Sequence, residues 1–530
     1  MTGINILRQS VTWRDFRDRV EPLSEKAKGR CFESLTRQFL QIHPTYATKL
    51  RNVWFLREVP AAVREHLNLP GPDEGIDLIA ETKEGNFWAV QCKYRTDETK
   101  SLNRGELGTF MDLAFDICRN IDLALVCTTS DRFSYKLKLY GPKLSLCSGD
   151  VWRSLDEQFF ESLHRHLDGQ AIRPIRSQPR PHQQRAISSA YSHFVRDQND
   201  RGKMIMPCGT GKSLAAYWIS RKLKAKTVLV AVPSLALIRQ TLQVWTAETL
   251  ADGTEMNWIC VCSDDSLGDS GTDDPIVLTQ DLGIRVHTDP VEIAEWLERA
   301  TGKSTLVLTT YQSGKATAEA ARKAGVVFDV GIMDEAHKTV GKHDSTFSHL
   351  LYEENISIRN RLFMTATERR YKGRGEHILS MEDPALYGGT FELLSFKEAL
   401  ASDPPILSDY MVLAMGVTES DIAGLIQRNV FVRPDKGRWD SDVEAQMLAA
   451  AVVLRKAMDD YPITHVVSFH STVARAKAFK KSQNCLSSAF PEFGELKTFH
   501  VEGKTPTAVR SRELCKFSDS MDRKGVNFSD

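Results

Sequence analysis

The chain has 530 residues, of which 42% are hydrophobic and 26% charged, and its 69 basic residues balance its 69 acidic ones. This composition is that of an ordinary folded protein with room for roughly three or four domains. The zero net charge excludes a molecule that binds a polyanion over its whole surface, so any contact with nucleic acid has to be local.

The N-terminus and the cysteines predict a cytoplasmic protein. The first residues contain no basic region followed by an apolar stretch, and no apolar run is long enough to span a bilayer. The ten cysteines include no CxxC pair, and the closest two are Cys260 and Cys262. Such spacing is typical of reduced thiols rather than of zinc or disulfide frameworks. We predict a cytoplasmic location and no membrane partner.

Residues 1–170 read as a small α/β domain with a carboxylate beside a Gln-x-Lys strand. Apolar residues at helical spacing predict a helix over residues 21–40 that carries Glu33. Asp77 opens the first strand of a hairpin, and Gln91 and Lys93 lie on one face of the second. Asp77, a backbone carbonyl near Cys92 and Glu33 would bind Mg²⁺, while Lys93 would orient water or stabilise charge on a phosphate.

These residues resemble the Mrr-like branch of the PD-(D/E)xK nucleases. The resemblance rests on Lys28-Gly29-x-x-Phe32-Glu33, Gly75-Ile76-Asp77 and Gln91-Cys92-Lys93, together with a further strand at 123–130. It implies a DNA endonuclease with Glu33, Asp77, Gln91 and Lys93 in catalytic positions and Mg²⁺ on Asp77 and Glu33. The alternative is a hairpin with a surface Asp and Lys.

Prolines among arginines predict a linker at residues 171–186. The basic stretch from Arg173 to Arg185 and a second one at 369–374 are candidate nucleic-acid contacts, and each is equally compatible with a solvated linker or loop. Gln183 lies at the end of the first stretch, upstream of a glycine-rich segment.

Residues 204–213, Met-Ile-Met-Pro-Cys-Gly-Thr-Gly-Lys-Ser, are typical of a strand that ends in a phosphate loop. The glycines allow backbone N–H groups to point at phosphate oxygens, Lys212 supplies charge, and Ser213 would bind Mg²⁺. Met206 stands where the general pattern has its first glycine. The predicted phosphate-binding residues are Gly209, Thr210, Gly211, Lys212 and Ser213.

Strand and helix patterns then alternate as in a doubly wound parallel sheet over residues 187–385. The apolar strand 326–333 runs into Asp334-Glu335-Ala336-His337. Asp334 would bind Mg²⁺ with Ser213, Glu335 would act as base toward the water that attacks the γ-phosphate, and His337 would sense the nucleotide state. Thr365 and Thr367, after the strand at 358–364, would pass that state to a neighbouring lobe.

The ordered set GTGKS, VPSLALIRQT, TTYQS, DEAH and MTAT resembles the first RecA-like lobe of superfamily 2 helicases and translocases over about residues 175–370. The resemblance implies ATP and Mg²⁺ as cofactors, an adenine-reading role for Gln183, and contacts from the hydroxyls of Ser234, Thr309, Thr310 and Tyr311 to a DNA backbone.

Residues 386–450 resemble the connector of restriction-type helicases, and residues 451–530 resemble an incomplete second RecA-like lobe. Within the connector, residues 403–406 have the proline pair of an amino-methyltransferase motif but lack its aromatic residue, which indicates a linker. The polar stretch 518–530 contains a single arginine, Arg523, and is expected to be disordered. We expect the chain to be a fragment of a longer protein.

The predicted fold class is thus α/β, with a PD-(D/E)xK nuclease-like domain, a doubly wound RecA-like lobe and an incomplete second lobe. The resemblance to single-chain type ISP and type I-like restriction enzymes implies an ATP-dependent translocase fused to a Mg²⁺-dependent endonuclease in anti-phage defence. Double-stranded DNA is the expected partner, with a methyltransferase and specificity module on a missing C-terminal part or a separate chain. The alternatives are a repair or remodelling helicase whose N-terminal domain binds DNA without cutting, and a remnant that binds ATP and DNA without turnover.

Overall fold

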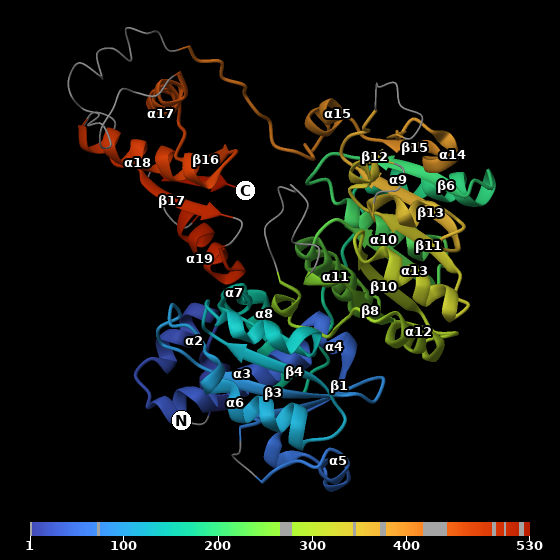
Figure 1. Cartoon of the computed structure of the whole chain (residues 1–530), viewed down its shortest axis with the longest axis vertical. Helices are drawn as coiled ribbons and strands as arrows, with labels where there is room; N and C mark the ends of the chain where they lie inside the picture. Colours follow the sequence, from blue (N-terminus) through green and yellow to red (C-terminus); the bar gives the residue numbers. More distant parts are fainter. Residues whose placement is uncertain are drawn as a thin grey trace. The chain divides into compact units, whose positions relative to one another are not determined.

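The computed structural model describes residues 3–71, 75–264, 278–342, 346–370, 378–416, 442–489, 494–502, 505–518 and 524–529 (Figure 1). The chain forms two compact units, which meet in sequence at Asp409 and Tyr410. Residues 371–374 of the second basic stretch, Arg523 and most of the segment 263–277 lie outside the described residues. Among the helices described, each is too short or too polar to cross a membrane.

The N-terminal part of the first unit is a five-stranded mixed sheet in the order β1-β2-β3-β4-β5. Its strands are β1 (Leu50–Phe55), β2 (Leu78–Thr82), β3 (Phe87–Lys93), β4 (Ile121–Thr128) and β5 (Leu144–Cys147). Its helices are α1 (Gly3–Gln9), α2 (Trp13–Val20), α3 (Glu25–Ile42), α4 (Pro44–Lys49), α5 (Ala61–His66), α6 (Arg104–Asp112), α7 (Gly149–Arg153) and α8 (Glu157–Leu167).

Alternation along β3 places its side chains in two separate cores. Trp88 and Val90 pack with α3 and α8, whereas Ala89 packs with α6 on the opposite face. Strands β1, β2 and β3 are antiparallel neighbours, and β4 and β5 continue the sheet in parallel with β3. This topology brings the ends of β3, β4 and β5 to one edge of the sheet.

The second part of this unit is an eight-stranded parallel sheet in the order β15-β6-β13-β11-β7-β10-β8-β9. Its strands are β6 (Arg201–Ile205), β7 (Thr227–Val232), β8 (Asn257–Val261), β9 (Val286–His287), β10 (Thr305–Thr310), β11 (Phe328–Met333), β13 (Ile358–Thr365) and β15 (Gly389–Leu393). Its helices are α9 (Pro181–Tyr191), α10 (Lys212–Lys222), α11 (Leu235–Ala251), α12 (Pro290–Arg299), α13 (Gly314–Lys323), α14 (Pro384–Tyr387) and α15 (Phe396–Ala401), and β12 (Gly341–Lys342) pairs with β14 (Ile378–Leu379).

The central strands β7, β10 and β11 are mostly apolar because both faces of the sheet are covered there. Every residue of β10 is buried, as are all but one in each of β6 and β7. The predicted doubly wound sheet is therefore confirmed, and it extends past the last predicted strand to β15, which pairs with β6. Short 3-10 or π segments are η1 (Leu56–Glu58), η2 (Leu113–Ile117), η3 (Tyr135–Lys143), η4 (Ser192–Arg196), η6 (Thr279–Leu282), η7 (Ala336–Thr339) and η8 (Thr346–Leu351).

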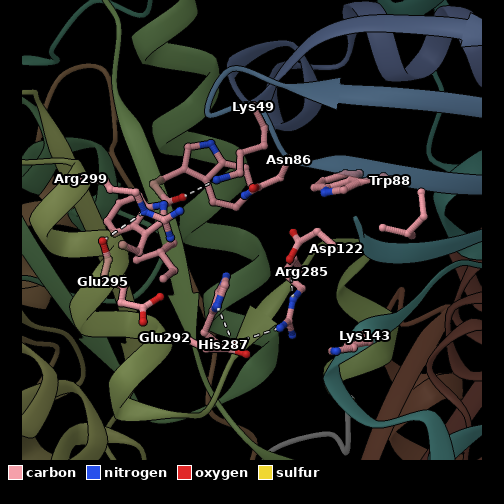
Figure 2. Close-up of a pocket in the computed structure, with 14 residues that line it drawn as sticks. Lys49, Asn86, Trp88, Asp122, Lys143, Arg285, His287, Glu292, Glu295 and Arg299 are labelled. Carbon is pink, nitrogen blue, oxygen red and sulfur yellow. Dashed lines mark hydrogen bonds and ion pairs between the residues drawn. The ribbon is translucent and has the colours of Figure 1, made fainter. Parts of the chain in front are cut away.

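The nuclease-like sheet and the motor sheet are joined by buried polar contacts within the first unit. Tyr46 Oη donates to the Gly283 carbonyl at 2.9 Å, and Trp258 Nε1 donates to Thr48 Oγ1 at 3.1 Å. Beside them lies a cavity of about 180 Å³ whose walls come from both sheets, including Trp88 and Arg285 (Figure 2). The two parts are therefore held by directional contacts as well as apolar packing.

The second unit contains a three-stranded parallel sheet in the order β16-β18-β17. Its elements are α17 (Asp442–Asp460), β16 (His465–His470), α18 (Val473–Ala489), β17 (Lys497–Glu502), α19 (Thr507–Ser518) and β18 (Lys524–Ser529). The prediction of a disordered stretch after residue 518 is wrong for residues 524–529, which form the central strand. Pairing with two strands that lie far away in the sequence fixes this segment, and local composition does not report such pairing.

Candidate active sites

The phosphate loop connects β6 to α10 and takes the backbone conformation that the sequence predicts. Gly209 and Gly211 both have φ of +82°, and Gly211 is the N-cap of α10. Thr210 is buried and its Oγ1 donates to the Pro207 carbonyl at 2.7 Å. Lys212 Nζ donates to the Met206 carbonyl at 3.3 Å. The backbone N–H groups of the loop and the Lys212 side chain therefore lie around one turn at the N-terminus of α10, which is where a phosphate binds in such loops.

Met206 contributes only its backbone to this arrangement. Its N–H donates to the Thr365 carbonyl at 3.0 Å, its carbonyl accepts from Lys212, and its side chain is buried in the apolar core. A side chain that points into the core does not obstruct the loop. This explains why methionine is compatible with a position where the general pattern has glycine.

Gln183 braces the phosphate loop from α9. Its Nε2 donates to the carbonyls of Thr210 and Gly211 at 3.4 and 3.2 Å, and its Oε1 accepts from the Arg180 N–H at 2.9 Å. A Cβ on residue 211 would lie 2.4 Å from Gln183 Nε2, so any other residue there would displace the Gln183 amide, and the φ of +82° favours glycine by itself. His182, which the sequence did not single out, contacts the Thr210 carbonyl through Nε2 at 2.9 Å.

A cavity of about 540 Å³ lies next to these residues. Its walls come from α9, α15 and the segment after it, and they include Arg180, Pro181, Arg185 and residues 402–406. The methyl-bearing end of Leu407 lies 3.3 Å from the position of a Cβ on Gly209. Residues 402–407, interpreted from sequence as a linker, thus pack against the phosphate loop. Only the tertiary fold reveals them, because the segment has no motif of its own.

Asp334 and Glu335 follow β11 and differ in their ionisation. Burial, followed by the neighbouring Glu335 charge, raises the pKa of Asp334 to about 6. A hydrogen bond from His337 lowers the pKa of Glu335, which takes a left-handed backbone with φ of +49° and lies 3.9 Å from Lys212 Nζ. Asp334 is therefore a buried carboxylate whose ionised form a nearby cation would stabilise. Glu335 is an ionised carboxylate that can accept a proton.

His337 joins this pair to the end of β13. Its Nδ1 is 3.3 Å from Glu335 Oε2 and 3.0 Å from Thr365 Oγ1. Thr365 Oγ1 donates its own hydrogen to the Thr367 carbonyl at 2.9 Å, so Nδ1 of His337 must carry the hydrogen that is shared with Thr365. The structure thus brings Glu335, His337, Thr365 and Thr367 into one hydrogen-bonded line.

The donor set fits a magnesium nucleotide. Ser213 Oγ is buried and has no hydrogen-bond partner among the described residues, although buried hydroxyls are ordinarily satisfied. A cation held by Ser213 and Asp334 would satisfy the hydroxyl and favour the ionised form of the carboxylate. Hydroxyl and carboxylate oxygens are the ligands that Mg²⁺ prefers.

The hydroxyls proposed to grip a DNA backbone are mostly engaged inside the lobe. Thr309, Thr310 and Tyr311 are buried; Thr309 contacts Thr317 at 2.9 Å, Thr310 donates to Ser313 at 3.2 Å, and Tyr311 donates to the Asp334 carbonyl at 2.7 Å. That expectation is therefore wrong for these three side chains, which stabilise the nucleotide side of the sheet. Ser234 caps α11 through the Leu237 N–H at 3.4 Å and is only half-buried.

The nuclease-like hairpin brings Asp77, Gln91 and Lys93 together. Asp77 Oδ2 accepts from the Cys92 N–H at 2.6 Å, and Gln91 Nε2 donates to the Gly75 carbonyl at 2.9 Å. Gln91 Oε1 is buried with no partner among the described residues. Lys93 ends β3 opposite Thr128, whose Oγ1 donates to the Lys93 carbonyl at 2.7 Å.

Glu33 approaches the same strand end from α3. Strand alternation places Gln91 and Lys93 on the face that α6 covers, whereas α3 covers the other face. Burial raises the pKa of the Cys92 thiol, and the charges of Asp77 and then Glu33 raise it further, so both carboxylates lie near Cys92. Among the described residues no group of three His, Cys, Asp or Glu side chains forms a metal site. Asp77 and the nearby carbonyls are oxygen donors of the kind that Mg²⁺ binds, with water in its other positions. Glu33 reaches this strand end from the face opposite to the Gln91 side chain.

Two arginines of the first basic stretch, Arg176 and Arg185, are paired with carboxylates. Arg185 is 2.7 Å from the buried Glu392 on β15, and Arg176 is 2.9 Å from Asp252. In the second stretch, Arg370 is 3.1 Å from Glu368. These arginines therefore have structural roles within the motor lobe.

Comparison with known proteins assigns families to the two sheets of the first unit. Residues 41–140 match a restriction endonuclease family, and residues 176–370 match the family of the type III restriction enzyme res subunit. A probable helicase of African swine fever virus, A859L (isolate Tick/Malawi/Lil 20-1/1983), is 32% identical over 211 residues, which cover 40% of this chain and 21% of the viral protein. The chain thus spans about a fifth of the viral relative.

One solved structure shares the fold of this chain, and a second is similar to part of it. The ATP-dependent type ISP restriction-modification enzyme LlaBIII bound to DNA matches 98% of this chain with a TM-score of 0.79 at 23% identity, and the match covers 34% of the enzyme. A nuclease-deletion mutant of the type ISP enzyme LlaGI matches 66% of this chain with a TM-score of 0.44. Residues 41–140 are therefore similar to the restriction endonuclease family and residues 176–370 to the type III res-subunit family, and the chain has the fold of the type ISP enzyme.

Proposed function

We propose that this chain is an ATP-driven DNA translocase that cuts DNA with its N-terminal domain in defence against foreign DNA. The observation that carries the proposal is the series of polar contacts that joins a phosphate loop to the end of β13. It runs from Lys212 through its 3.9 Å ion pair with Glu335, and then through His337 to Thr365. Double-stranded DNA is the proposed substrate and track. The solved enzyme with this fold is bound to DNA.

The motor residues divide the work of hydrolysis. Lys212 and the backbone N–H groups of residues 209–213 would bind the phosphates, and Ser213 and Asp334 would hold Mg²⁺, which neutralises charge on the phosphates. Glu335, kept ionised, would orient and deprotonate the attacking water. When Glu335 takes the proton from the water, its hydrogen bond with His337 would change. Thr365, which contacts His337, would respond to that change.

The nuclease residues would act on a phosphodiester. Asp77, with Glu33 and a backbone carbonyl near Cys92, would hold Mg²⁺, which would polarise the scissile phosphate. Lys93, half-buried at the end of β3, would stabilise charge on the phosphate or orient the water. A methyltransferase and specificity module, on further sequence or on a separate chain, is the proposed partner that would select sites.

Two assays test this assignment with matched variants. We expect DNA-stimulated ATP hydrolysis by the wild type and at least a roughly hundredfold loss in Lys212→Ala, since the lysine contacts the transferred phosphate. If Lys212→Ala binds and hydrolyses ATP like the wild type, the motor assignment fails. Lys222→Ala, at the far end of α10, is the control for a lost lysine.

Cleavage is tested on plasmid DNA with Mg²⁺ and ATP. Asp77→Asn and Lys93→Ala should lose strand cleavage while they retain ATP hydrolysis. Equal cleavage by wild type and both variants would remove the nuclease assignment and favour a remodelling helicase whose N-terminal domain only binds DNA. ATP binding without hydrolysis in the wild type would favour a protein that binds ATP and DNA without turnover.

A further inference from the structure

Helix α11 of the motor lobe contacts both the phosphate-loop helix and the nuclease domain. Trp245 of α11 packs edge-on against Tyr217 of α10 with ring centroids 5.3 Å apart. On an earlier turn of the same helix, Arg239 Nη1 donates to Asp150 Oδ2 of α7 at 2.9 Å. One rigid element therefore spans from the helix that carries Lys212 and Ser213 to the nuclease domain.

The Arg239–Asp150 pair is buried and held in one geometry. Only 23% of the Arg239 side chain and 8% of the Asp150 side chain are exposed. Ser148 Oγ donates to the other oxygen of Asp150 at 2.6 Å. Burial, followed by the Arg239 charge, lowers the pKa of the nearby His43 to about 4, so His43 stays neutral beside the pair. Tyr46 and Cys147 are the other titratable groups that face Arg239.

On the nuclease side, α7 contacts the strand and the helix that carry the catalytic residues. Trp152 Nε1 donates to the Thr128 carbonyl at 3.0 Å, and Thr128 Oγ1 donates to the Lys93 carbonyl. The Trp152 ring lies 4.8 Å from that of Phe32, the residue before Glu33. A displacement of α7 would therefore reach the backbone of Lys93 and the turn of α3 that carries Glu33.

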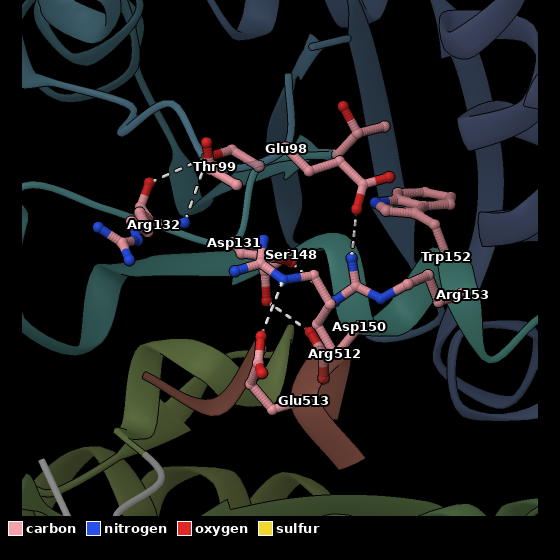
Figure 3. Close-up of polar contacts among 12 residues, drawn as sticks. Glu98, Thr99, Asp131, Arg132, Ser148, Asp150, Trp152, Arg153, Arg512 and Glu513 are labelled. Atoms are coloured by element: carbon pink, nitrogen blue, oxygen red, sulfur yellow. Dashed lines mark hydrogen bonds and ion pairs between the residues drawn. The ribbon is translucent and has the colours of Figure 1, made fainter. Parts of the chain in front are cut away.

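Arg153, also on α7, fixes the loops that follow β3 and β4 (Figure 3). Its two terminal nitrogens donate to Glu98 Oε2 and to Asp131 Oδ1, each at 2.7 Å. Asp131 is fully buried. Glu98 also forms an ion pair with Arg17 of α2 at 2.7 Å. Helix α7 is therefore bound to the whole edge of the sheet at which β3 and β4 end.

We propose that Arg239 and Asp150 are positioning residues that make DNA cleavage depend on the nucleotide state of the motor. When α10 shifts with its bound phosphates, α11 shifts with it through Trp245, and the ion pair carries that shift to α7. Helix α7 then sets Lys93 and Glu33 against Asp77. Helix α11 would have two packed arrangements, one with the Arg239–Asp150 ion pair formed and one without it. This inference rests on the proposed function.

The test uses the full-length protein with plasmid DNA, and it measures ATP hydrolysis and strand cleavage in the same reaction. The variants are Arg239→Met, Asp150→Asn, their double and the charge swap Arg239→Asp with Asp150→Arg. Arg359→Met is the control for the loss of an Arg–Asp ion pair in the motor lobe. Arg359 makes a 2.7 Å ion pair with Asp329, and its side chain is 68% exposed. Thermal unfolding of each variant records whether the fold is kept.

Each single variant should hydrolyse ATP at a rate within roughly twofold of the wild type. It should cut at least about tenfold fewer strands per ATP hydrolysed, which is within the range of coupling between allosteric sites. The double variant should lose no more than either single, the charge swap should recover part of the cleavage, and Arg359→Met should behave as wild type. Arg239→Lys keeps the charge and should retain most of the coupling, which separates a lost contact from a damaged fold.

Wild-type numbers of strands cut per ATP in Arg239→Met and Asp150→Asn would overturn the proposal. Additive losses in the double variant would also overturn it, because the two residues would then act separately. An absence of ATP hydrolysis or of cleavage in the wild type itself would instead contradict the proposed function, so the two failures are distinguishable.

Discussion

Two buried polar atoms lie at the sites where the sequence motifs predict ligands. Ser213 Oγ in the phosphate loop and Gln91 Oε1 in the nuclease-like hairpin are both buried without partners among the described residues. An unpaired buried polar group destabilises a fold. Other buried atoms, such as Trp13 Nε1 and Trp245 Nε1, share this property, so it supports a ligand site only together with the motif residues around it.

This argument predicts opposite effects of Ser213→Ala on stability and activity. Removing a hydroxyl that makes no hydrogen bond should leave the thermal unfolding midpoint unchanged or raise it. The same change should lower Mg²⁺-dependent ATP hydrolysis at least roughly a hundredfold, because one ligand of the cation is lost. Differential scanning calorimetry and an ATPase assay measure the two effects. A lower midpoint together with unchanged hydrolysis would mean that the hydroxyl is structural.

His43 gives a prediction on pH at the same scale. Its pKa is about 4 in the folded chain, mainly because burial disfavours the charged ring. An unfolded chain binds a proton at His43 below about pH 6.5, while the folded one does not until about pH 4, so stability falls as the pH drops through this window. We expect His43→Gln to lose less unfolding free energy between pH 7 and pH 4.5 than the wild type, by up to about 2–3 kcal/mol. Parallel pH dependences in urea unfolding would contradict this.

At the scale of elements, β15 and β18 are the strands that the sequence predicts least well. β15 adds to the motor sheet beside β6, and β18 inserts between β16 and β17. Neither carries a motif, and each is defined by backbone pairing with strands that are distant in the sequence. Sequence patterns do predict the strands β7, β10, β11 and β13, since each is a long apolar run in a sheet covered on both faces.

The central position of β18 has a consequence for stability. Removal of residues 524–530 would separate β16 from β17 and leave unpaired backbone on both. We expect such a deletion to make residues 442–518 susceptible to proteolysis while residues 3–409 stay resistant. Limited proteolysis with mass spectrometry reports this, and deletion of residue 530 alone is the control. Equal resistance of the second unit in both proteins would show that β18 is dispensable.

At the scale of the whole molecule, nuclease and motor domains share one compact unit. Trp258 is buried on the motor side, donates from Nε1 to Thr48, and has Lys49 Nζ 5.0 Å from the ring centroid. The interface between the two domains therefore contains polar groups that would lose their partners if either domain were isolated. The two domains should therefore unfold together.

The Trp258→Ala variant tests that expectation. Loss of a fully buried Trp should cost about 3–5 kcal/mol. If the domains are cooperative, the whole of residues 3–409 should unfold in one transition at a lower temperature, as measured by calorimetry and by proteolysis of both domains. Trp54→Ala, at a half-buried site on β1, is the control. Two separate transitions in the wild type would show that the domains are independent.

The sequence by itself determined the nucleotide loop, the order of the motor strands and the hairpin that carries Asp77, Gln91 and Lys93. Each of these depends on local spacing: glycines that permit a positive φ, apolar runs, and the period of two along a strand. The tertiary structure alone decided that Gln183 braces the loop, that Thr309, Thr310 and Tyr311 point inward, and that Arg239 meets Asp150. These contacts join residues far apart in the chain, and such pairing arises only when the elements pack.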